Sequence, residues 1–597
     1  MHTDQSMLPR TVAELPFLSA ERFGSAPAQR FKRDGHWQDL SHAELGEAAQ
    51  EIGLGLIGLG LRPGDRVCVL ADTRPEFTQV QYGISAAGAV VVPIYPSSSA
   101  EECAWVLGDS GAKAVICENA AQLEKLRRIR AGLPALAHVL VIDPADPVTR
   151  TLDQLRSRGR AGNPVELRCR TAAVRPDDPA LLIYTSGTTG KPKGCVLSHR
   201  NMVACCQVTA RLRVAGAEDT AYLFLPLAHV FAQVIQLSIT ATGGVVAYGS
   251  GDASAIVPDC QETAPTILPA VPRVYEKVHA RFADLLPAEE LARAVRTGLA
   301  VRRLRAAGQP VPCELRRDFE QAEERLFAPV RALFGGRLRM AVSGAAPIAP
   351  NILRFFHAAG VPVYEGYGLS ESASLGTLNT VDATRIGTIG RPVPGCEVRL
   401  AEDGEILLRG PHVFAGYWNN PRATLEALAD GWLRTGDLGA VDEDGFVTVT
   451  GRKKDIIITA GGKNLTPANL ENDLRESPFI SHAVMYGDRR PYPVALITLD
   501  AERILAWARE RGLPADVEIL AGHPEVRALL QRVLDDVNGR YARVTRIKKF
   551  AVLGRDFSQE TGELTPTLKL RRQAVHRAHA DVLDALYTDI PAPRLRP

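Results

Sequence analysis

The stretch that decides the fold is Tyr184-Thr-Ser-Gly-Thr-Thr-Gly-Lys-Pro-Lys-Gly194, which follows the apolar run Ala180–Ile183. Its glycines let the chain turn tightly and expose backbone N–H groups, while its hydroxyls and two ammonium groups add further donors. Such donors converge on an anion, and the density of them favours a nucleotide triphosphate. The sequence therefore predicts a phosphate-binding loop, with an ordinary surface turn as the alternative.

This loop is not a Walker A P-loop. That motif places four residues between its first glycine and its Gly-Lys-Ser/Thr. Here only two threonines separate Gly187 from Gly190-Lys191, and Pro192 follows the lysine. An ordinary P-loop NTPase is therefore a poor interpretation.

Composition indicates a multidomain chain. The 597 residues are 46% hydrophobic with a net charge of +2, and single cores stop growing beyond about 300 residues. The balanced charge gives no reason to expect nucleic acid as a partner. Ten cysteines without C-x-x-C spacing argue against a zinc site and against a secreted disulfide framework.

The sequence predicts neither a signal peptide nor a membrane span. Met1–Phe17 carries charges at Asp4, Arg10 and Glu14 and lacks a continuous apolar region. The longest apolar runs, such as Leu54–Leu61, are far shorter than the roughly 20 residues that a membrane helix needs. We therefore expect a cytoplasmic protein, with contact to the inner face of a membrane left open.

Lysine is concentrated at a few places. Of the 70 basic residues only 12 are lysine, so arginine is the usual cation of this chain. Half of the lysines nevertheless lie in three short motif segments: Lys191, Lys193, Lys453, Lys454, Lys463 and Lys569. Because lysine is a compact point charge and arginine a wide planar fork, these positions are expected to need an ammonium group.

Apolar periodicity predicts alternating helices and strands up to about residue 380. Helical patterns at Ala43–Leu59 and Phe77–Ala87 alternate with the apolar strands Arg66–Leu70 and Ala89–Ile94. Alternation of this kind favours parallel sheets covered by helices. Residues 281–332 form a charged helical insert, interpreted as a solvated helix pair, with a membrane-surface role as the alternative.

Beyond residue 385 the pattern changes to short strands separated by turns. Glu397–Leu400, Glu405–Leu408 and Phe446–Thr450 are the clearest of these strands, and they predict a small β subdomain at about 385–450. Mixed helices and strands return after Lys454. We place a domain boundary there, giving domains 1–453 and 454–597.

Seven motifs in order carry a family resemblance. Besides the loop at residues 184–194 they are Leu225-Pro-Leu-Ala-His229, Ser343-Gly-Ala-Ala-Pro347, Tyr364-Glu-Gly-Tyr-Gly-Leu-Ser-Glu371, Gly431-Trp-Leu-Arg-Thr-Gly-Asp437, Gly451-Arg-Lys-Lys-Asp455 and Leu564-Thr-Pro-Thr-Leu-Lys569. The chain resembles the adenylate-forming superfamily, and most of all its bacterial long-chain fatty-acyl-CoA synthetases. The resemblance implies an α/β fold: a large N-terminal domain of two helix-flanked mixed sheets plus the β subdomain, then a smaller mobile α+β domain.

The resemblance also implies the nucleotide site. The β- and γ-phosphates of ATP would be held by Thr185, Ser186, Gly187, Thr188, Thr189, Gly190 and Lys191. Mg²⁺ would be bound by Glu371 and Thr185, since hard cations prefer oxygen ligands; a merely solvated glutamate is the alternative. The adenine pocket would be lined by Gly344, Ala345, Ala346, Glu365, Gly366 and Tyr367, with Tyr367 stacked on the base. Gly368 would also belong to the nucleotide site, and the hydroxyl of Ser370 would contact a phosphate. Many relatives have threonine at the position of Ser370.

Further roles follow from the same resemblance. Asp437 would accept both ribose hydroxyls, with a turn cap as the alternative, and Arg452 would assist at the ribose or phosphate. Lys569 would neutralise charge between the attacking carboxylate and the α-phosphate, and Lys454 would be the hinge of the mobile domain. Gly461 and Gly462 would then give a pantetheine arm access to the acyl group.

His229 precedes a helical pattern and has two interpretations, an ordinary core histidine or a gate beside the substrate carboxylate. No acidic residue lies in Ala228–Phe231 to pair with a substrate amine, which favours an uncharged acid. The expected activity is ATP-dependent ligation of a long-chain fatty acid to coenzyme A. The alternatives are a fatty-acyl-AMP ligase that loads a carrier protein, a ligase for another hydrophobic or aryl acid, and a catalytically silent nucleotide-binding scaffold.

Overall fold

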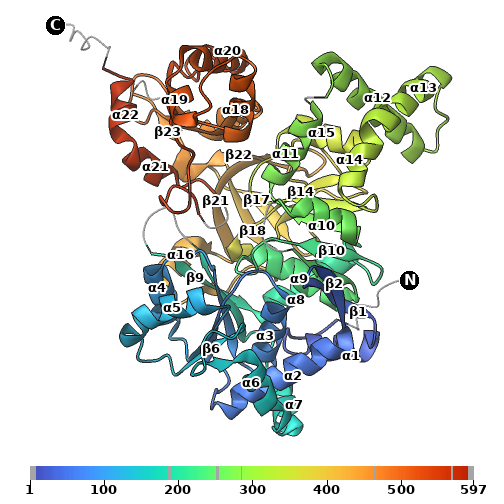
Figure 1. The fold of residues 1–597 in the computed structure, drawn as a ribbon, viewed down its shortest axis with the longest axis vertical. Coiled ribbons are helices and arrows are strands. Elements are labelled where there is room, and N and C mark those ends of the chain that lie inside the picture. Colours follow the sequence, from blue (N-terminus) through green and yellow to red (C-terminus); the bar gives the residue numbers. More distant parts are fainter. Residues whose placement is uncertain are drawn as a thin grey trace.

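The structure is a computed structural model that describes residues 8–185, 191–249, 254–283, 285–460, 464–565 and 569–588. A large unit makes up most of the molecule, and a smaller C-terminal unit lies against one end of it (Figure 1). The predicted fold class is confirmed: two helix-flanked mixed sheets, a small β subdomain and a final α+β unit.

Thr185 and Lys193, which flank the phosphate-loop glycines, lie on two strands of an eight-stranded sheet. In spatial order its strands are β19 (Gly416–Tyr417), β9 (Lys193–Ser198), β8 (Pro179–Thr185), β4 (Val90–Ile94), β3 (Arg66–Leu70), β5 (Ala114–Cys117), β6 (His138–Val141) and β7 (Arg150–Thr151). From β8 to β7 the neighbours pair in parallel, while β9 and β19 are antiparallel. Thr185 therefore stands at the carboxyl end of β8, the edge at which open α/β sheets usually bind ligands.

A nine-stranded sheet carries the other nucleotide motifs. In spatial order its strands are β16 (Arg391–Pro392), β15 (Thr377–Leu378), β14 (Val363–Tyr367), β13 (Met340–Ser343), β12 (Ile267–Ala270), β10 (Thr220–Leu223), β11 (Val245–Tyr248), β1 (Pro27–Arg33) and β2 (His36–Ser41). Strands β13 and β14 are parallel neighbours. The Ser-Gly-Ala-Ala-Pro and Glu-Gly-Tyr-Gly motifs, which begin at the carboxyl ends of these strands, are thereby brought side by side.

Helices separate and cover the two sheets. A single apolar cluster between them takes residues from both, including Val69 and Leu223. The helices of this central layer are α1 (Leu15–Phe23), α2 (His42–Gly58), α3 (Pro75–Ala86), α8 (His199–Arg211) and α9 (Val230–Thr242), with α6 (Leu152–Arg160) and α7 (Pro164–Ala173) packed on α2. The outer face of the eight-stranded sheet is covered by α4 (Ala100–Ser110) and α5 (Ala120–Ile129).

The outer face of the nine-stranded sheet is covered by a helical group. Its members are α10 (Ile256–Thr263), α11 (Pro272–Ala283), α12 (Ala288–Ala306), α13 (Cys313–Ala322), α14 (Ala328–Leu333) and α15 (Pro350–Ala359). The segment 281–332 is helical as predicted, and most of α12 and α13 is solvent-exposed, while α12 buries a narrow face at Thr297, Gly298 and Val301. A Cβ on Gly298 would lie 2.8 Å from Cβ of Ala358, so glycine lets α12 approach α15 closely.

The β subdomain and the C-terminal unit complete the fold. The subdomain sheet contains β17 (Glu397–Leu400), β18 (Glu405–Arg409), β21 (Trp432–Val441), β20 (Leu428–Ala429) and β22 (Val447–Arg452), and α16 (Pro421–Ala427) precedes β20. The C-terminal unit contains the pair β23 (Ile457–Ile458) and β24 (Asn464–Leu465), the sheet β25 (Ile480–Tyr486), β26 (Val494–Leu499) and β27 (Lys549–Leu553), and the helices α17 (Pro467–Arg475), α18 (Ala501–Arg509), α19 (Val517–Ala521), α20 (Pro524–Gly539), α21 (Arg572–Ala578) and α22 (Ala580–Ala585). Among the described residues, no helix is both long and apolar enough to cross a membrane.

Candidate active site

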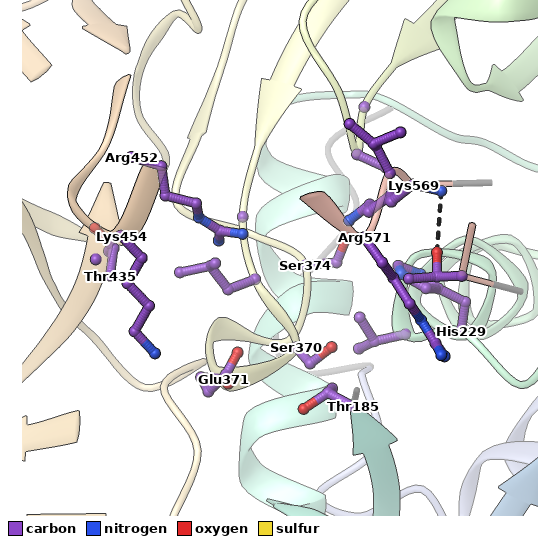
Figure 2. A pocket seen from close by; sticks show the side chains of 18 of the residues that line it. Thr185, His229, Ser370, Glu371, Ser374, Thr435, Arg452, Lys454, Lys569 and Arg571 are labelled. Carbon is purple, nitrogen blue, oxygen red and sulfur yellow. Dashed lines mark hydrogen bonds between the residues drawn. The ribbon is translucent and has the colours of Figure 1, made fainter. Parts of the chain in front are cut away.

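A cavity of about 1230 Å³ lies between the large unit and the C-terminal unit. It brings together eleven residues that were predicted to belong to the site: Thr185, His229, Gly344, Ala345, Gly366, Gly368, Ser370, Glu371, Arg452, Lys454 and Lys569. Figure 2 shows the oxygens of Thr185, Ser370 and Glu371 near one another, with Lys569 entering on a loop of the C-terminal unit. Residues from both sheets, the β subdomain and the C-terminal unit thus meet in one space.

Glu371 is held by a residue that the sequence analysis did not predict. It lies in a 3-10 turn, Ser370–Ser372, and its Oε1 accepts a hydrogen bond of 2.6 Å from the hydroxyl of Tyr417. Burial and the nearby carboxylate raise the pKa of Tyr417, so this tyrosine stays a neutral donor. A carboxylate has about four lone-pair sites, so Glu371 can accept this bond and still bind a ligand in the cavity that it lines.

The backbone around this turn is strained. Ala373 and Ser374, which follow the turn, have φ values of 46° and 68°, a region that residues with a Cβ seldom adopt. A Cβ on Gly368 would lie only 2.3 Å from the backbone of Ser374, so the chain folds back on itself here only because residue 368 is glycine. Strain of this kind is concentrated at ligand sites.

The Ser-Gly-Ala-Ala-Pro motif forms a second strained wall. Gly344 lines the cavity, and a Cβ placed on it would meet nothing closer than 3.6 Å. Ala345 lines the cavity too, with a φ of 71°. Small side chains on this wall leave room for a flat ring, as the adenine assignment requires.

Asp437 stands directly behind the cavity with both carboxylate oxygens engaged. Oδ1 accepts a hydrogen bond of 2.8 Å from Nε of Arg452, and Oδ2 accepts one of 2.7 Å from the hydroxyl of Tyr367. The carboxylate side chain is only 9% exposed, and its charge raises the pKa of Arg452 against the opposing effect of burial. A carboxylate has about four lone-pair sites, so each oxygen can accept one more donor.

Lys569 is presented by a hairpin-like loop. Leu564 and Leu570 form a β-bridge, Thr565 donates its N–H to the carbonyl of Lys569 at 2.8 Å, and the N–H of Lys569 bonds to Oγ1 of Thr565 at 3.0 Å (Figure 2). The surrounding protein and the Arg452 cation lower the pKa of Lys569 below its ordinary value of 10.5, while Asp437 and Glu371 oppose the shift.

His229 caps helix α9 and faces the cavity. Its Nδ1 accepts a hydrogen bond of 3.2 Å from the N–H of Phe231, and burial together with the Lys569 cation lowers the pKa of His229 to about 3. The neutral ring therefore carries its proton on Nε2, which is a donor. His229 is thus a hydrogen-bond donor at the cavity wall, suited to a carboxylate oxygen.

Besides Tyr367 and Asp437, three other predicted residues of the described chain are absent from the cavity lining. Lys191 places its ammonium 4.1 Å from the ring centre of Trp105, whose Nε1 donates to the carbonyl of Pro192 at 2.8 Å. Glu365 is oriented toward the backbone N–H groups of Ile348 and Gly387, and burial raises its pKa to about 7. Ala346 is also absent from the described lining.

The predicted Ser186, Gly187, Thr188, Thr189 and Gly190, and likewise Gly461 and Gly462, lie outside the described residues. Their roles stay predictions.

The described cavity lining is strongly cationic. Its basic side chains are Lys193, Arg434, Arg452, Lys453, Lys454, Arg475, Lys569, Arg571, Arg572 and Arg577, and its acidic ones are Glu102, Glu371, Glu405, Glu426, Asp455 and Glu471. Such an excess favours a ligand with several negative charges. Arg434, Arg475 and the arginines after Lys569 were not predicted, because no local pattern distinguishes them from the chain's many surface arginines.

Comparison with known proteins defines the class. The AMP-binding enzyme family model matches residues 17–418, and the model of the AMP-binding enzyme C-terminal domain matches residues 454–591. The chain belongs to the AMP-binding enzyme family, which confirms the predicted membership of the adenylate-forming superfamily.

Two relatives and one solved structure illustrate this membership. Over 93% of both chains the protein is 42% identical to the long-chain-fatty-acid–CoA ligase FadD15 of Mycobacterium bovis. It is 32% identical to the long-chain-fatty-acid–CoA ligase ACSBG2 of Xenopus laevis, over 98% of this chain and 85% of that one. The adenylation domain of a carboxylic acid reductase from Segniliparus rugosus, solved with AMP and a co-purified carboxylic acid, shares the fold with a TM-score of 0.76 at 19% identity, covering 99% of this chain and 95% of that domain.

Proposed function

We propose that this protein ligates a long-chain fatty acid to coenzyme A, using ATP and Mg²⁺ and passing through an acyl-adenylate. The observation that carries the proposal is the position of Lys569, which comes from the C-terminal unit yet lines the same cavity as Glu371 and Thr185. The relatives named above as long-chain-fatty-acid–CoA ligases, similar over nearly their whole length, support the choice of acid and acceptor.

Two displacements make up the reaction. First, an oxygen of the fatty-acid carboxylate attacks the α-phosphorus of ATP, and the bond to the pyrophosphate oxygen breaks. Then the sulfur of coenzyme A, having lost its proton, attacks the acyl carbon and AMP leaves. The protein needs no covalent nucleophile here, since positioning and charge neutralisation provide the catalysis. The ammonium of Lys569 and the Nε2–H of His229 are suited to stabilise the negative charge on the carboxylate and the α-phosphate in the first step.

The nucleotide fits this site in several respects. The strained walls at Ala345 and Ser374 leave space for a flat base, and Asp437 is set to accept ribose hydroxyls. We assign the phosphates to the loop that ends at Lys191. The ammonium of Lys191 lies against Trp105, from which a flexible lysine can turn toward a phosphate.

Mg²⁺ fits the oxygens of Glu371 and Thr185. Both residues line the cavity, and a carboxylate that accepts the Tyr417 hydroxyl bond keeps lone pairs for a cation. Mg²⁺ is usually held by one or two carboxylates together with substrate phosphates. When bound, the ion would offset the negative charge of the phosphates.

The domain assignment is part of this proposal. We assign residues 1–453 to the N-terminal domain and 454–597 to the C-terminal domain, with the pivot at Lys454 and pantetheine access at Gly461-Gly462. The turn Lys453–Asp455, which separates β22 from the C-terminal unit, supports the boundary.

A product assay tests the function. With palmitate, ATP, Mg²⁺ and coenzyme A, we expect stoichiometric palmitoyl-CoA, AMP and pyrophosphate. Glu371→Gln should lose most turnover and regain little at high Mg²⁺, whereas Glu426→Gln, another acidic residue of the cavity rim, should keep it. Acyl-AMP that accumulates without thioester would favour a fatty-acyl-AMP ligase, and no pyrophosphate with any acid would favour a silent scaffold.

A further inference from the structure

The C-terminal unit shares no apolar core with the large unit. Each buried apolar cluster of the described residues takes its members either from positions up to 449 or from positions 457 onward. Units without a common core move relative to one another unless polar contacts hold them. The orientation of Lys569 in the cavity therefore depends on the polar contacts across this boundary.

Four charged residues of alternating sign cross the boundary at helix α11. Nη2 of Arg273 lies 2.7 Å from Oδ2 of Asp500, and Nη2 of Arg475 lies 3.3 Å from Oε2 of Glu276. Arg273 also approaches Glu276 at 3.7 Å. Arg273 and Glu276 belong to the large unit, Arg475 and Asp500 to the C-terminal unit; we call these four residues the boundary network.

The boundary network is largely removed from water. The side chains of Asp500 and Glu276 are 18% and 17% exposed, and those of Arg273 and Arg475 are 34% and 26% exposed. Fully exposed ion pairs contribute little, but removing one partner of a mostly buried pair leaves a poorly hydrated charge behind. The relative placement of the two units is therefore sensitive to each of these charges.

Helix α17 links the boundary network to Lys569. Arg475 is the last residue of α17, and Glu471 lies one turn earlier on the same helix. Both oxygens of Glu471 accept hydrogen bonds of 2.6 Å from Arg572, which follows Lys569 by three residues. One helical turn thus contacts the large unit through Arg475 and holds the Lys569 loop through Glu471.

We propose that Arg273, Glu276, Arg475 and Asp500 are positioning residues for adenylation, which hold the C-terminal unit so that Lys569 enters the cavity. This inference rests on the proposed function, because it assigns the network to one of the two half-reactions. Arg273, Glu276 and Asp500 are absent from the described cavity lining, and only Arg475 reaches it. The network therefore acts through α17 and the Lys569 loop.

The test measures the two half-reactions separately. Adenylation is followed as palmitate-dependent exchange of labelled pyrophosphate into ATP, and thioester formation as palmitoyl-CoA production from synthetic palmitoyl-AMP. Asp500→Asn is a suitable variant, because Asp500 caps α18 by accepting the N–H of Arg503 and asparagine keeps a capping oxygen. Arg273→Gln removes the partner charge, Arg273→Lys restores it, and Arg281→Gln alters an exposed arginine on the same helix as the control.

We expect adenylation to fall about fivefold in Asp500→Asn and Arg273→Gln, with thioester formation from palmitoyl-AMP unchanged. Arg273→Lys should recover most of the loss, and Arg281→Gln should match the wild type. Raising the salt concentration should slow wild-type adenylation more than that of Asp500→Asn, because screening acts on the same ion pairs.

Unchanged adenylation in both variants, or equal losses in the two half-reactions, would overturn the inference. Failure of the proposed function has a different signature, since wild-type protein would then show no palmitate-dependent exchange at all. Far-UV circular dichroism and the thermal midpoint identify a variant that fails to fold. In that case Glu276→Gln is tested with the same two assays. A loss confined to adenylation would support the inference, and no loss, or an equal loss in both half-reactions, would overturn it.

Discussion

The hydroxyl of Tyr367 donates a hydrogen bond of 2.7 Å to Oδ2 of Asp437, from which it is separated by 70 residues. The bond joins strand β14 of the nine-stranded sheet to strand β21 of the β subdomain. With Arg452 on Oδ1, it fixes the carboxylate in one orientation. A ribose would thus meet a carboxylate that is already oriented, and preorganisation of this kind lowers the entropic cost of binding.

Tyr367→Phe should therefore weaken ATP binding. A hydrogen bond to a charged group is worth about 1.5–3 kcal/mol, so we expect KM for ATP in the exchange assay to rise about tenfold. Tyr364→Phe is the matched control, because Tyr364 lies on the same strand and is not bonded to Asp437. An unchanged KM in Tyr367→Phe would mean that Arg452 alone orients the carboxylate.

Lys569→Ala should abolish adenylation and spare the second step. Loss of a donor that stabilises transition-state charge costs about 3 kcal/mol, about a hundredfold in rate. Pyrophosphate exchange should fall by at least that factor, while thioester formation from supplied acyl-AMP should stay near the wild-type rate. Lys548→Ala, an exposed lysine in the same unit, serves as the control. Equal losses in both steps would contradict the assignment of Lys569 to adenylation alone.

The lowered pKa of Lys569 has a kinetic consequence. Because the surrounding protein and Arg452 favour the neutral amine, the ammonium form is lost at a pH below 10.5. Adenylation should therefore decline as the pH rises toward that value, and Lys569→Arg, which stays charged, should have a flatter alkaline limb. The pH–rate profile of pyrophosphate exchange measures this. A decline of the same shape in Lys569→Arg would assign the alkaline limb to another group.

Strands of a large sheet and of the β subdomain were predictable because local sequence determines them. The run Arg66–Leu70 is apolar at each position after the arginine, and the structure has strand β3 with these same bounds. Glu397–Leu400 is likewise strand β17, as predicted. In both segments the local pattern and the bounding turns favour a strand, and tertiary packing does not override that preference.

The partners of the site residues were not predictable in the same way. Tyr417 bonds to Glu371, and Trp105 contacts Lys191, across separations of 46 and 86 positions. These pairs form because β19 pairs with β9 at one edge of the eight-stranded sheet and α4 packs on the outer face of that sheet, which are properties of the topology. The buried face of the insert could not be predicted for a related reason: the face at Gly298 and Val301 is narrow, and α15 supplies the surface that covers it.

Glu365 should make stability depend on pH. Burial raises its pKa from 4.5 to about 7, so between these values the folded protein holds a proton that the unfolded chain has released. Stability must then fall as the pH rises from about 4.5 to 7, by an amount on the order of 3–4 kcal/mol at about 1.4 kcal/mol per pKa unit.

Glu365→Gln removes this titration. The variant should be more stable than the wild type at pH 8 and similar to it at pH 4.5, as measured by urea unfolding at both values. Glu402→Gln, an exposed glutamate of the β subdomain, gives the control. A constant difference between wild type and Glu365→Gln at the two pH values would show that the carboxyl does not titrate in this range.

The length of the acid should govern the rate until the acyl pocket is full. Each methylene transferred from water into an apolar pocket contributes about 0.8 kcal/mol, so kcat/KM should rise severalfold or more for every two carbons added and then level off. A series of saturated acids from acetate to C20, assayed with coenzyme A, measures this dependence; benzoate and leucine complete the panel. The proposal requires a plateau among the long acids and little turnover of leucine, because no acidic side chain at Ala228–Phe231 is present to pair with its amine. A flat series, or a preference for benzoate, would instead identify a ligase for another hydrophobic acid with the same adenylation chemistry.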